Sequence, residues 1–133
     1  ITKIIRGNDM KVRGIRGATT VEENNREEIL SATQEVLQEI ISTNNIEDDD
    51  ISAIFFTTTR DLNAEFPAAA ARIHMGWTNA ALMSGHEMEV PDSPQKCIRV
   101  LMLVNTEKTS EQIKHIYLRG AANLRARGLE EKN

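Results

Sequence analysis

The chain has 133 residues, of which 40% are hydrophobic and 27% charged, and its formal net charge is −4. This length suits one domain with its own core, and the composition is that of a globular protein rather than a disordered or fibrous one. The negative charge argues against nucleic acid as the main partner, although arginines gathered in one cleft would still bind a small anion.

The single cysteine cannot form an internal disulfide, and the longest apolar run is far shorter than the ~20 residues that span a bilayer. The N-terminus lacks the continuous apolar core of a secretion signal. We therefore expect a cytoplasmic protein with no membrane partner. A strand pattern begins just after Met10, so residues 1–9 are expected to be an expression leader or an upstream extension. Residues 10–125 are the expected single domain, and residues 126–133 the expected flexible tail.

The first expected element is a strand over residues 11–17, whose two glycines suggest close approach of a backbone or ligand. A helix follows, with Asn24 as its expected N-cap and a glutamate three residues later. Apolar residues recur at helical spacing over residues 29–41. Asn44 and Asn45 end this helix. The acids at residues 47–50 predict a solvated turn, because their spacing fits no calcium loop.

Residues 51–58 predict a second buried strand. The loop after it runs into Pro67, a residue that suits the first turn of a helix. That short helix is expected over residues 68–75 and to stop at Gly76. Residues 77–83 predict a third strand.

Residues 84–86 predict a turn, residues 87–90 the start of another strand, and residues 91–94 a loop that two prolines force. A strand over residues 97–104 follows. Thr109, with a glutamine three residues later, predicts a capping box for a last helix. One face of that helix carries Ile113, Ile116, Tyr117, Ala121 and Leu124. This order of elements predicts an α+β fold in which a single mixed β-sheet packs against helices.

The strand expected over residues 97–104 is apolar except for Arg99, which is typical of a mid-sheet strand buried on both faces. A guanidinium keeps its proton and costs on the order of several kcal/mol to take out of water unpaired. Arg99 is therefore expected to meet an anion. That anion is either an internal carboxylate, such as Glu87 or Glu89, or a ligand, and the residue type alone does not decide between them.

Several reaction classes lack their residues. The chain has no glycine-rich phosphate loop and no nucleophile elbow, and its three scattered histidines lack metal-ligand spacing, so no metal site is expected. Cys97 flanks a buried strand and is expected to be an inert small hydrophobe. Taken singly, the other polar candidates also fit solvated helix ends or core packing. These candidates are Arg16, Arg72, Arg99, Arg125, Glu87 and Tyr117.

The run RGIRGATTVE at residues 13–22 resembles the opening of the AroH-class, or monofunctional Bacillus-type, chorismate mutases. Further stretches agree with that family in the same order, namely residues 61–68, 87–88, 96–100, 115–118 and 124–125. The resemblance covers nearly the whole chain, from residue 10 to about residue 125.

The resemblance implies an isomerase that rearranges chorismate to prephenate in aromatic amino-acid biosynthesis. It also implies a homotrimer whose mixed sheets form a pseudo α/β barrel, with helices outside and active sites between subunits. A Claisen rearrangement is unimolecular and transfers no proton, so it needs no base, nucleophile, metal or cofactor. Its catalysis comes from holding a flexible dianion in its reactive conformation and from a fixed positive charge where negative charge develops.

Carried over by position, the resemblance implies two catalytic residues, Arg99 at the ether oxygen and Glu87 as acceptor for the ring hydroxyl. Arg16 and Tyr117 would bind substrate carboxylate. The other implied substrate-binding positions are Phe66, Ala68, Arg72, Ser84 and Arg125.

Two positions depart from the family pattern. Ala69 stands where a lysine is often found, which weakens the case for a second cationic grip on the carboxylates and would raise KM. Ser84 stands where a cysteine is often found, and its hydroxyl still offers a hydrogen bond.

Two other functions share this architecture. An imine-hydrolysing deaminase of the Rid type is also trimeric with an interfacial arginine, and loss of chorismate absorbance would separate it from a mutase. A non-catalytic trimer that binds a dicarboxylate, which Ala69 favours, would bind ligand without turnover.

Overall fold

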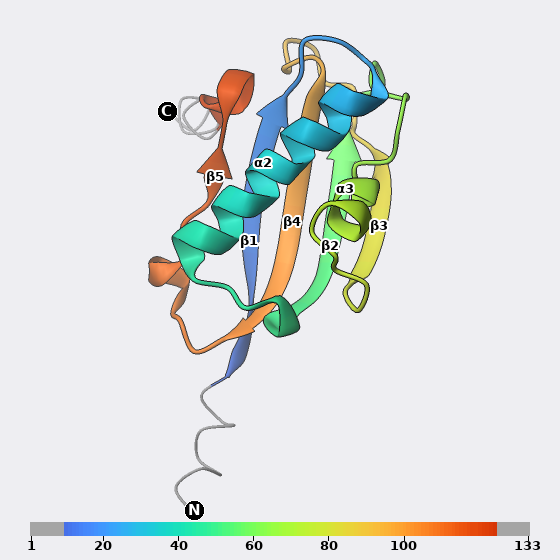
Figure 1. Cartoon of the computed structure of the whole chain (residues 1–133). Coiled ribbons are helices and arrows are strands. Elements are labelled where there is room, and N and C mark those ends of the chain that lie inside the picture. Colours follow the sequence, from blue (N-terminus) through green and yellow to red (C-terminus); the bar gives the residue numbers. More distant parts are fainter. Residues whose placement is uncertain (1–9, 125–133) are drawn as a thin grey trace, which may run out of the picture.

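The computed structural model describes residues 10–124, so the expected leader, Arg125 and the expected tail lie outside the described residues. Within that range, five strands form one mixed sheet in the order β3-β2-β4-β1-β5. The strands are β1 (Lys11–Thr20), β2 (Ile51–Thr58), β3 (Ala81–His86), β4 (Cys97–Thr106) and β5 (Ile116–Tyr117). Two helices, α2 (Arg26–Asn44) and α3 (Ala68–Ile73), lie on one face of the sheet (Figure 1). The predicted α+β fold, a mixed sheet packed against helices, is therefore confirmed.

Strand β4 lies at the centre of the sheet, as predicted for the strand that carries Arg99. It pairs antiparallel with β1 on one side and with β2 on the other. The outer pairs, β2 with β3 and β1 with β5, are parallel. Neither α2 nor α3, the helices of the described range, combines the length and apolar character that a membrane span requires.

Helix α2 begins one residue later than predicted. Its N-cap is Asn25, whose side chain accepts a hydrogen bond from the backbone N–H of Glu28 at 2.9 Å. The expected cap, Asn24, instead uses its side-chain oxygen to accept from the backbone N–H groups of Asn63 and Ala64, each at 3.1 Å. The long-range bonds of Asn24 tie the loop before α3 to the start of α2. The predicted end is confirmed, because Asn45 caps the helix in the left-handed conformation.

The main core lies between α2 and the sheet face that it covers. Val36 and Ile40 from α2 pack with Phe56 of β2 and Met102 of β4, and all four are almost fully buried. Gly17 of β1 allows this contact, since a Cβ there would lie 2.8 Å from Cδ1 of Ile40. The close approach predicted from the glycines of this strand is confirmed at Gly17.

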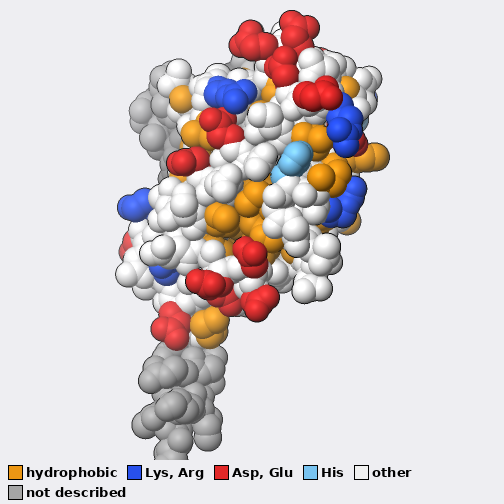
Figure 2. Space-filling view, in the orientation of Figure 1, with side chains coloured by type: hydrophobic (Ala, Val, Ile, Leu, Met, Phe, Trp, Pro, Cys, Tyr) orange, Lys and Arg blue, Asp and Glu red, His pale blue; other side chains and the backbone are white. Residues whose placement is uncertain are grey.

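The opposite sheet face, here called the open face, carries neither α2 nor α3. Burial alternates along β4, so that Arg99 and Leu101 are exposed while their neighbours Ile98 and Val100 are buried. The prediction that this strand is buried on both faces is therefore wrong for the single chain. Its two flanking strands cover its edges, but the described helices cover one face only. Figure 2 shows the helix-covered side, where acidic side chains lie toward both ends of the described body.

The region around β3 also differs from prediction. The strand runs over residues 81–86 rather than 77–83, so the expected turn at residues 84–86 belongs to the strand. Residues 87–90 form a loop instead of a new strand. The cause is parallel pairing with β2, in which Phe56 pairs with Ser84 and Thr58 with His86. Trp77 is buried in the core instead of lying in a strand.

The predicted last helix is wrong. The capping box of Thr109 and Gln112 is present, but it opens a single 3-10 turn, Ser110–Gln112. The chain then becomes extended, and β5 pairs with Gly17 and Ala18 at the edge of β1. A second 3-10 turn, Arg119–Ala121, follows. Backbone pairing with β1 thus overrides the local helical signal.

The remaining elements agree with prediction in kind. Strand β2 has the predicted bounds, and β1 and β4 continue a few residues beyond theirs. Helix α3 ends at Ile73, short of the predicted Met75, and Gly76 follows with a positive φ of 70°. The acids at residues 48–50 form a 3-10 turn in which no residue is buried.

Candidate active site

Arg99 stands on the open face at the centre of the sheet. Its Nε lies 3.6 Å from Oε2 of Glu87, which is too long for a hydrogen bond. The two side chains are 46% and 29% exposed. Of the two anions left open by the sequence, the structure therefore shows an internal carboxylate near the guanidinium. That carboxylate does not enclose Arg99, so a ligand can still reach it.

Glu87 is held by two consecutive residues of β2. Its backbone N–H donates to the carbonyl of Thr58 at 2.8 Å, which continues the β2–β3 pairing by one residue. The hydroxyl of Thr57 donates to Oε2 of Glu87 at 2.7 Å. The carboxylate is thus directed toward the open face beside Arg99.

Tyr117 and Arg16 lie on the same face. Ala18 pairs with Arg99 on one side and with Tyr117 on the other, and paired residues point to the same face of a sheet. Arg16 lies two residues before Ala18 on β1, and its side chain is exposed. Its backbone N–H donates to Nδ1 of His115 at 2.9 Å. We call Arg16, Thr57, Glu87, Arg99 and Tyr117 the arginine group.

Cys97, on β4, lies two residues from Arg99 and is buried with Ala18 and Ala121. Burial raises the pKa of its thiol above the ordinary value of 9.0, and the nearby Arg99 charge offsets only part of this effect. The thiol is therefore protonated near neutral pH and has the character of an inert small hydrophobe. Among residues 10–124, no cluster of three or more His, Cys, Asp or Glu side chains has the arrangement of a metal site.

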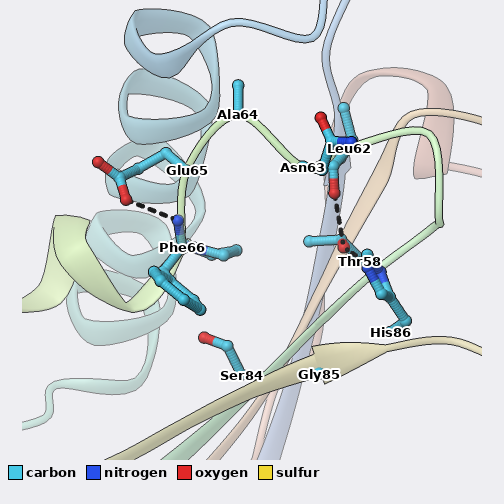
Figure 3. Close-up of a pocket in the computed structure, with 10 residues that line it drawn as sticks. Thr58, Leu62, Asn63, Ala64, Glu65, Phe66, Ser84, Gly85 and His86 are labelled. Atoms are coloured by element: carbon cyan, nitrogen blue, oxygen red, sulfur yellow. Dashed lines mark hydrogen bonds between the residues drawn. The ribbon is translucent and has the colours of Figure 1, made fainter.

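A second group of predicted residues borders a pocket of about 410 Å³ near the ends of β2 and β3. Phe66 and Ser84 both line it, and Figure 3 shows the Ser84 hydroxyl pointing toward Phe66. The Ser84 oxygen is buried and finds no hydrogen-bond partner among the described residues. Phe66 is 68% exposed. This pocket therefore offers a free hydroxyl and an exposed aromatic ring.

Glu65, which also lines the pocket, fixes the backbone of Phe66. Its carboxylate accepts a hydrogen bond from the Phe66 N–H at 2.8 Å and another from Nε of Arg26 at 2.9 Å. These bonds lower the pKa of Glu65 below its ordinary value of 4.5, and the charge of Arg72 adds a smaller effect. Phe66 is thus attached to an ion pair between the loop and α2.

Ala68, Ala69 and Arg72 do not belong to the pocket lining. Ala68 packs in the core, and Arg72 is exposed on α3. Ala69, where the family pattern has a lysine, is 2% exposed and packs with Leu30 and Ala70. Arg125 lies outside the described residues. In this chain, position 69 therefore serves the contact between α3 and α2.

The arginine group and the pocket lie on opposite faces of the sheet. Ser84 pairs with the buried Phe56 and so points to the helix-covered face, whereas Arg99 points to the open face. The structure brings Arg16, Glu87, Arg99 and Tyr117 together on one face and Phe66 with Ser84 on the other. Within one chain, these two sets of residues do not line a common site.

Sequence reasoning missed three polar residues of these surroundings, Thr57, Glu65 and His86. Thr57 binds Glu87, and His86 lines the pocket with Nδ1 3.2 Å from the Thr58 hydroxyl. Alternation along residues 51–58 places Thr57 and Phe55 on one face, but the strand register that sets Thr57 beside Arg99 is a long-range feature. His86 was missed because residues 84–86 were predicted to form a turn, whereas they belong to β3.

A family model described as chorismate mutase type I matches residues 12–127. The chain belongs to the type I chorismate mutase family. A chorismate mutase AroH of Thermus thermophilus is 45% identical over 115 residues, which are 86% of this chain and 93% of that protein. The chorismate mutase AroH of Bacillus subtilis is 43% identical over 116 residues, 87% of this chain and 91% of that protein.

A solved chorismate mutase from Clostridium thermocellum superposes with a TM-score of 0.80 at 55% identity, covering 82% of this chain and 96% of that one. The resemblance seen in the sequence motifs is thus confirmed over most of the chain. Chorismate mutases are isomerases, so the predicted function and enzyme class are also confirmed at the level of the family.

Proposed function

We propose that this chorismate mutase rearranges chorismate to prephenate with Arg99 as its main electrostatic catalyst. The observation that carries the proposal is the guanidinium on the open face, which lies near Glu87 without a hydrogen bond to it. A fixed positive charge stabilises the ether oxygen as its bond to carbon breaks and its negative charge grows. Because Arg99 lies on a central strand that pairs on both edges, its backbone position is set before substrate binds.

The other members of the arginine group would orient the substrate. Glu87 accepts a hydrogen bond from the ring hydroxyl, while Arg16 and Tyr117 bind carboxylate. Holding a flexible dianion in one reactive conformation lowers the entropic part of the barrier. On the pocket side, Ser84 donates to the substrate and Phe66 packs against it. Arg72 and Arg125 act near the rim, and Ala68 lies beside the pocket loop.

The active site is proposed to lie between subunits of a homotrimer whose sheets form a pseudo α/β barrel. The arginine group and the pocket occupy opposite faces of one chain, so a single substrate touches both only when they come from neighbouring subunits. The open face also exposes large hydrophobic side chains, which favours burial against another subunit. They include Val12 (59% exposed), Phe55 (38%), Met83 (64%) and Leu101 (38%).

A steady-state assay tests the reaction, since conversion of chorismate removes its ultraviolet absorbance. We expect saturable loss of that absorbance. Binding of chorismate without turnover would support the dicarboxylate-binding alternative, and turnover of imines alone would support the deaminase. Light scattering should give a mass near three times the 14.9 kDa of one chain. The cytoplasmic location stays a prediction.

Mixing two inactive variants tests the shared site. Arg99→Ala removes the arginine half, and Ser84→Trp fills the pocket half. If each site takes one half from each of two subunits, random assembly after joint refolding restores about one quarter of the sites. Each variant refolded alone is the control. No recovery from stable mixed trimers would contradict a site that takes its two halves from different subunits.

A further inference from the structure

We propose that Thr57 is a positioning residue whose hydroxyl holds the Glu87 carboxylate away from Arg99. This inference rests on the proposed function, because it assigns Arg99 and Glu87 separate roles toward the substrate. It concerns a residue on β2 that none of the sequence motifs singled out.

The contact geometry supports this role. Thr57 pairs directly with Arg99 across β2 and β4, so both side chains leave the same face of the sheet. The Thr57 hydroxyl donates to Oε2 of Glu87 at 2.7 Å, while the same oxygen lies 3.6 Å from Nε of Arg99. A bond of 2.7 Å between a hydroxyl and a carboxylate is short and charge-assisted. Oε2 is therefore bound to the neutral donor and only near the cation.

In this arrangement, the Glu87 carboxylate and the Arg99 guanidinium each keep atoms available for the substrate. Within residues 10–124, the Thr57 hydroxyl is the donor found on the Glu87 carboxylate, so Oε1 remains open for a substrate hydroxyl. The guanidinium keeps its donor edge for an oxygen that becomes anionic. A bidentate Arg99–Glu87 pair would instead use both groups on each other, since carboxylate and guanidinium match in a two-bond geometry.

Loss of the hydroxyl removes the competing donor. In Thr57→Val, the Glu87 backbone stays anchored to the carbonyl of Thr58, but its side chain is free to rotate toward the cation. Closure of that short gap engages Arg99 and lowers its effect on the transition state. The defect is therefore expected in kcat more than in KM, whereas a merely structural role for Thr57 would change stability and leave the rate per folded enzyme unaltered.

The test compares Thr57→Val with Thr57→Ser, which keeps the donor. Thr43→Val, on the exposed surface of α2, is the matched control. Steady-state kinetics with chorismate should show kcat lowered about tenfold or more in Thr57→Val, which is the usual effect of losing a hydrogen bond to a charged group. Thr57→Ser should stay within about threefold of the parent, and Thr43→Val should match the parent.

A crystal structure of Thr57→Val supplies the second measurement. We expect a Glu87 oxygen within hydrogen-bond distance of Arg99. Unchanged kcat, equal losses in Thr57→Val and Thr57→Ser, or a carboxylate that stays 3.6 Å from Nε would overturn the inference. An inactive parent enzyme would instead refute the proposed function, so the two failures are distinguishable.

Discussion

Replacing Arg99 by alanine should abolish most activity while leaving the fold intact. The free energy of unfolding should change little, because the core contacts of β4 come from Ile98 and Val100, which are 0% and 3% exposed. The Arg99 side chain is 46% exposed, and its ion pair with Glu87 spans 3.6 Å. Exposed pairs of this kind contribute about 0–1 kcal/mol to the free energy of unfolding. Glu87 also keeps its bond to Thr57 after the arginine is lost.

The expected effect of Arg99→Ala on kcat is larger than its effect on stability. Loss of one preorganised donor at a developing oxyanion costs roughly 2.7–4 kcal/mol of transition-state stabilisation, which is about 100- to 1000-fold in kcat. Arg99→Lys should fall between the parent and Arg99→Ala, because lysine keeps a positive charge but lacks the planar fork.

Steady-state kinetics with chorismate and urea denaturation, each run on the same preparations, make the measurement. Arg60→Ala is the matched control, since Arg60 also forms an exposed pair, with Glu89 at 3.4 Å. It should change neither kcat nor stability appreciably. Near-parental kcat in Arg99→Ala, or a rate loss fully explained by unfolding, would refute the reasoning.

Three further results are expected. Gly17→Ala should lower the free energy of unfolding by about 1–3 kcal/mol, because its new methyl group would overlap α2. Gly85→Ala, which has open space around it, should change the free energy of unfolding little. Equal effects of the two substitutions in denaturant melts would contradict the packing argument. The Cys97 thiol should react slowly with a disulfide reagent at pH 7, because burial raises its pKa, and rapidly after unfolding. Fast labelling of the native protein would contradict this prediction. Because the pKa of Glu65 is lowered in the folded state, its carboxylate stabilises the fold at pH values above 4.5, and this contribution is lost as the pH falls from 4.5 through the folded-state pKa. The destabilisation caused by Glu65→Gln should therefore shrink between pH 7 and pH 3, and a constant difference would exclude the pKa as its cause.

Local patterns predicted the elements whose stability is local or whose burial is one-sided. The helical spacing over residues 29–41 located α2, and the run at residues 51–58 gave the bounds of β2. The position of Asn24 went wrong by one residue because a loop 39 residues away uses its side chain.

Pairing between distant segments could not be read from the sequence. The capping box at Thr109 formed as expected, yet residues 116–117 became a strand because the edge of β1 supplied backbone partners about 99 residues away. The same limit applies to residues 84–86, whose turn-like composition yields to the ladder of β2.

The sequence named individual candidate residues, but it did not show that they lie on two opposite faces of the sheet. Motif resemblance named Arg99, Glu87 and Ser84 as candidate positions, but no local signal separates the two faces of the sheet on which they lie. The apolar run around Arg99 predicted two-sided burial, while the single chain covers one side. That discrepancy is itself informative, because the uncovered side chains are those that the proposed trimer would bury.

The alternation along β4 has a consequence for how such an enzyme evolves. Odd-numbered positions from Cys97 to Leu103 lie on one side of the strand and even-numbered positions on the other. Under the proposed function, mutations that change the contact with substrate and mutations that change the hydrophobic core therefore fall on different codons of one short segment. A substitution at Arg99 can therefore alter turnover while the core contacts of Ile98 and Val100, which are 0% and 3% exposed, stay in place.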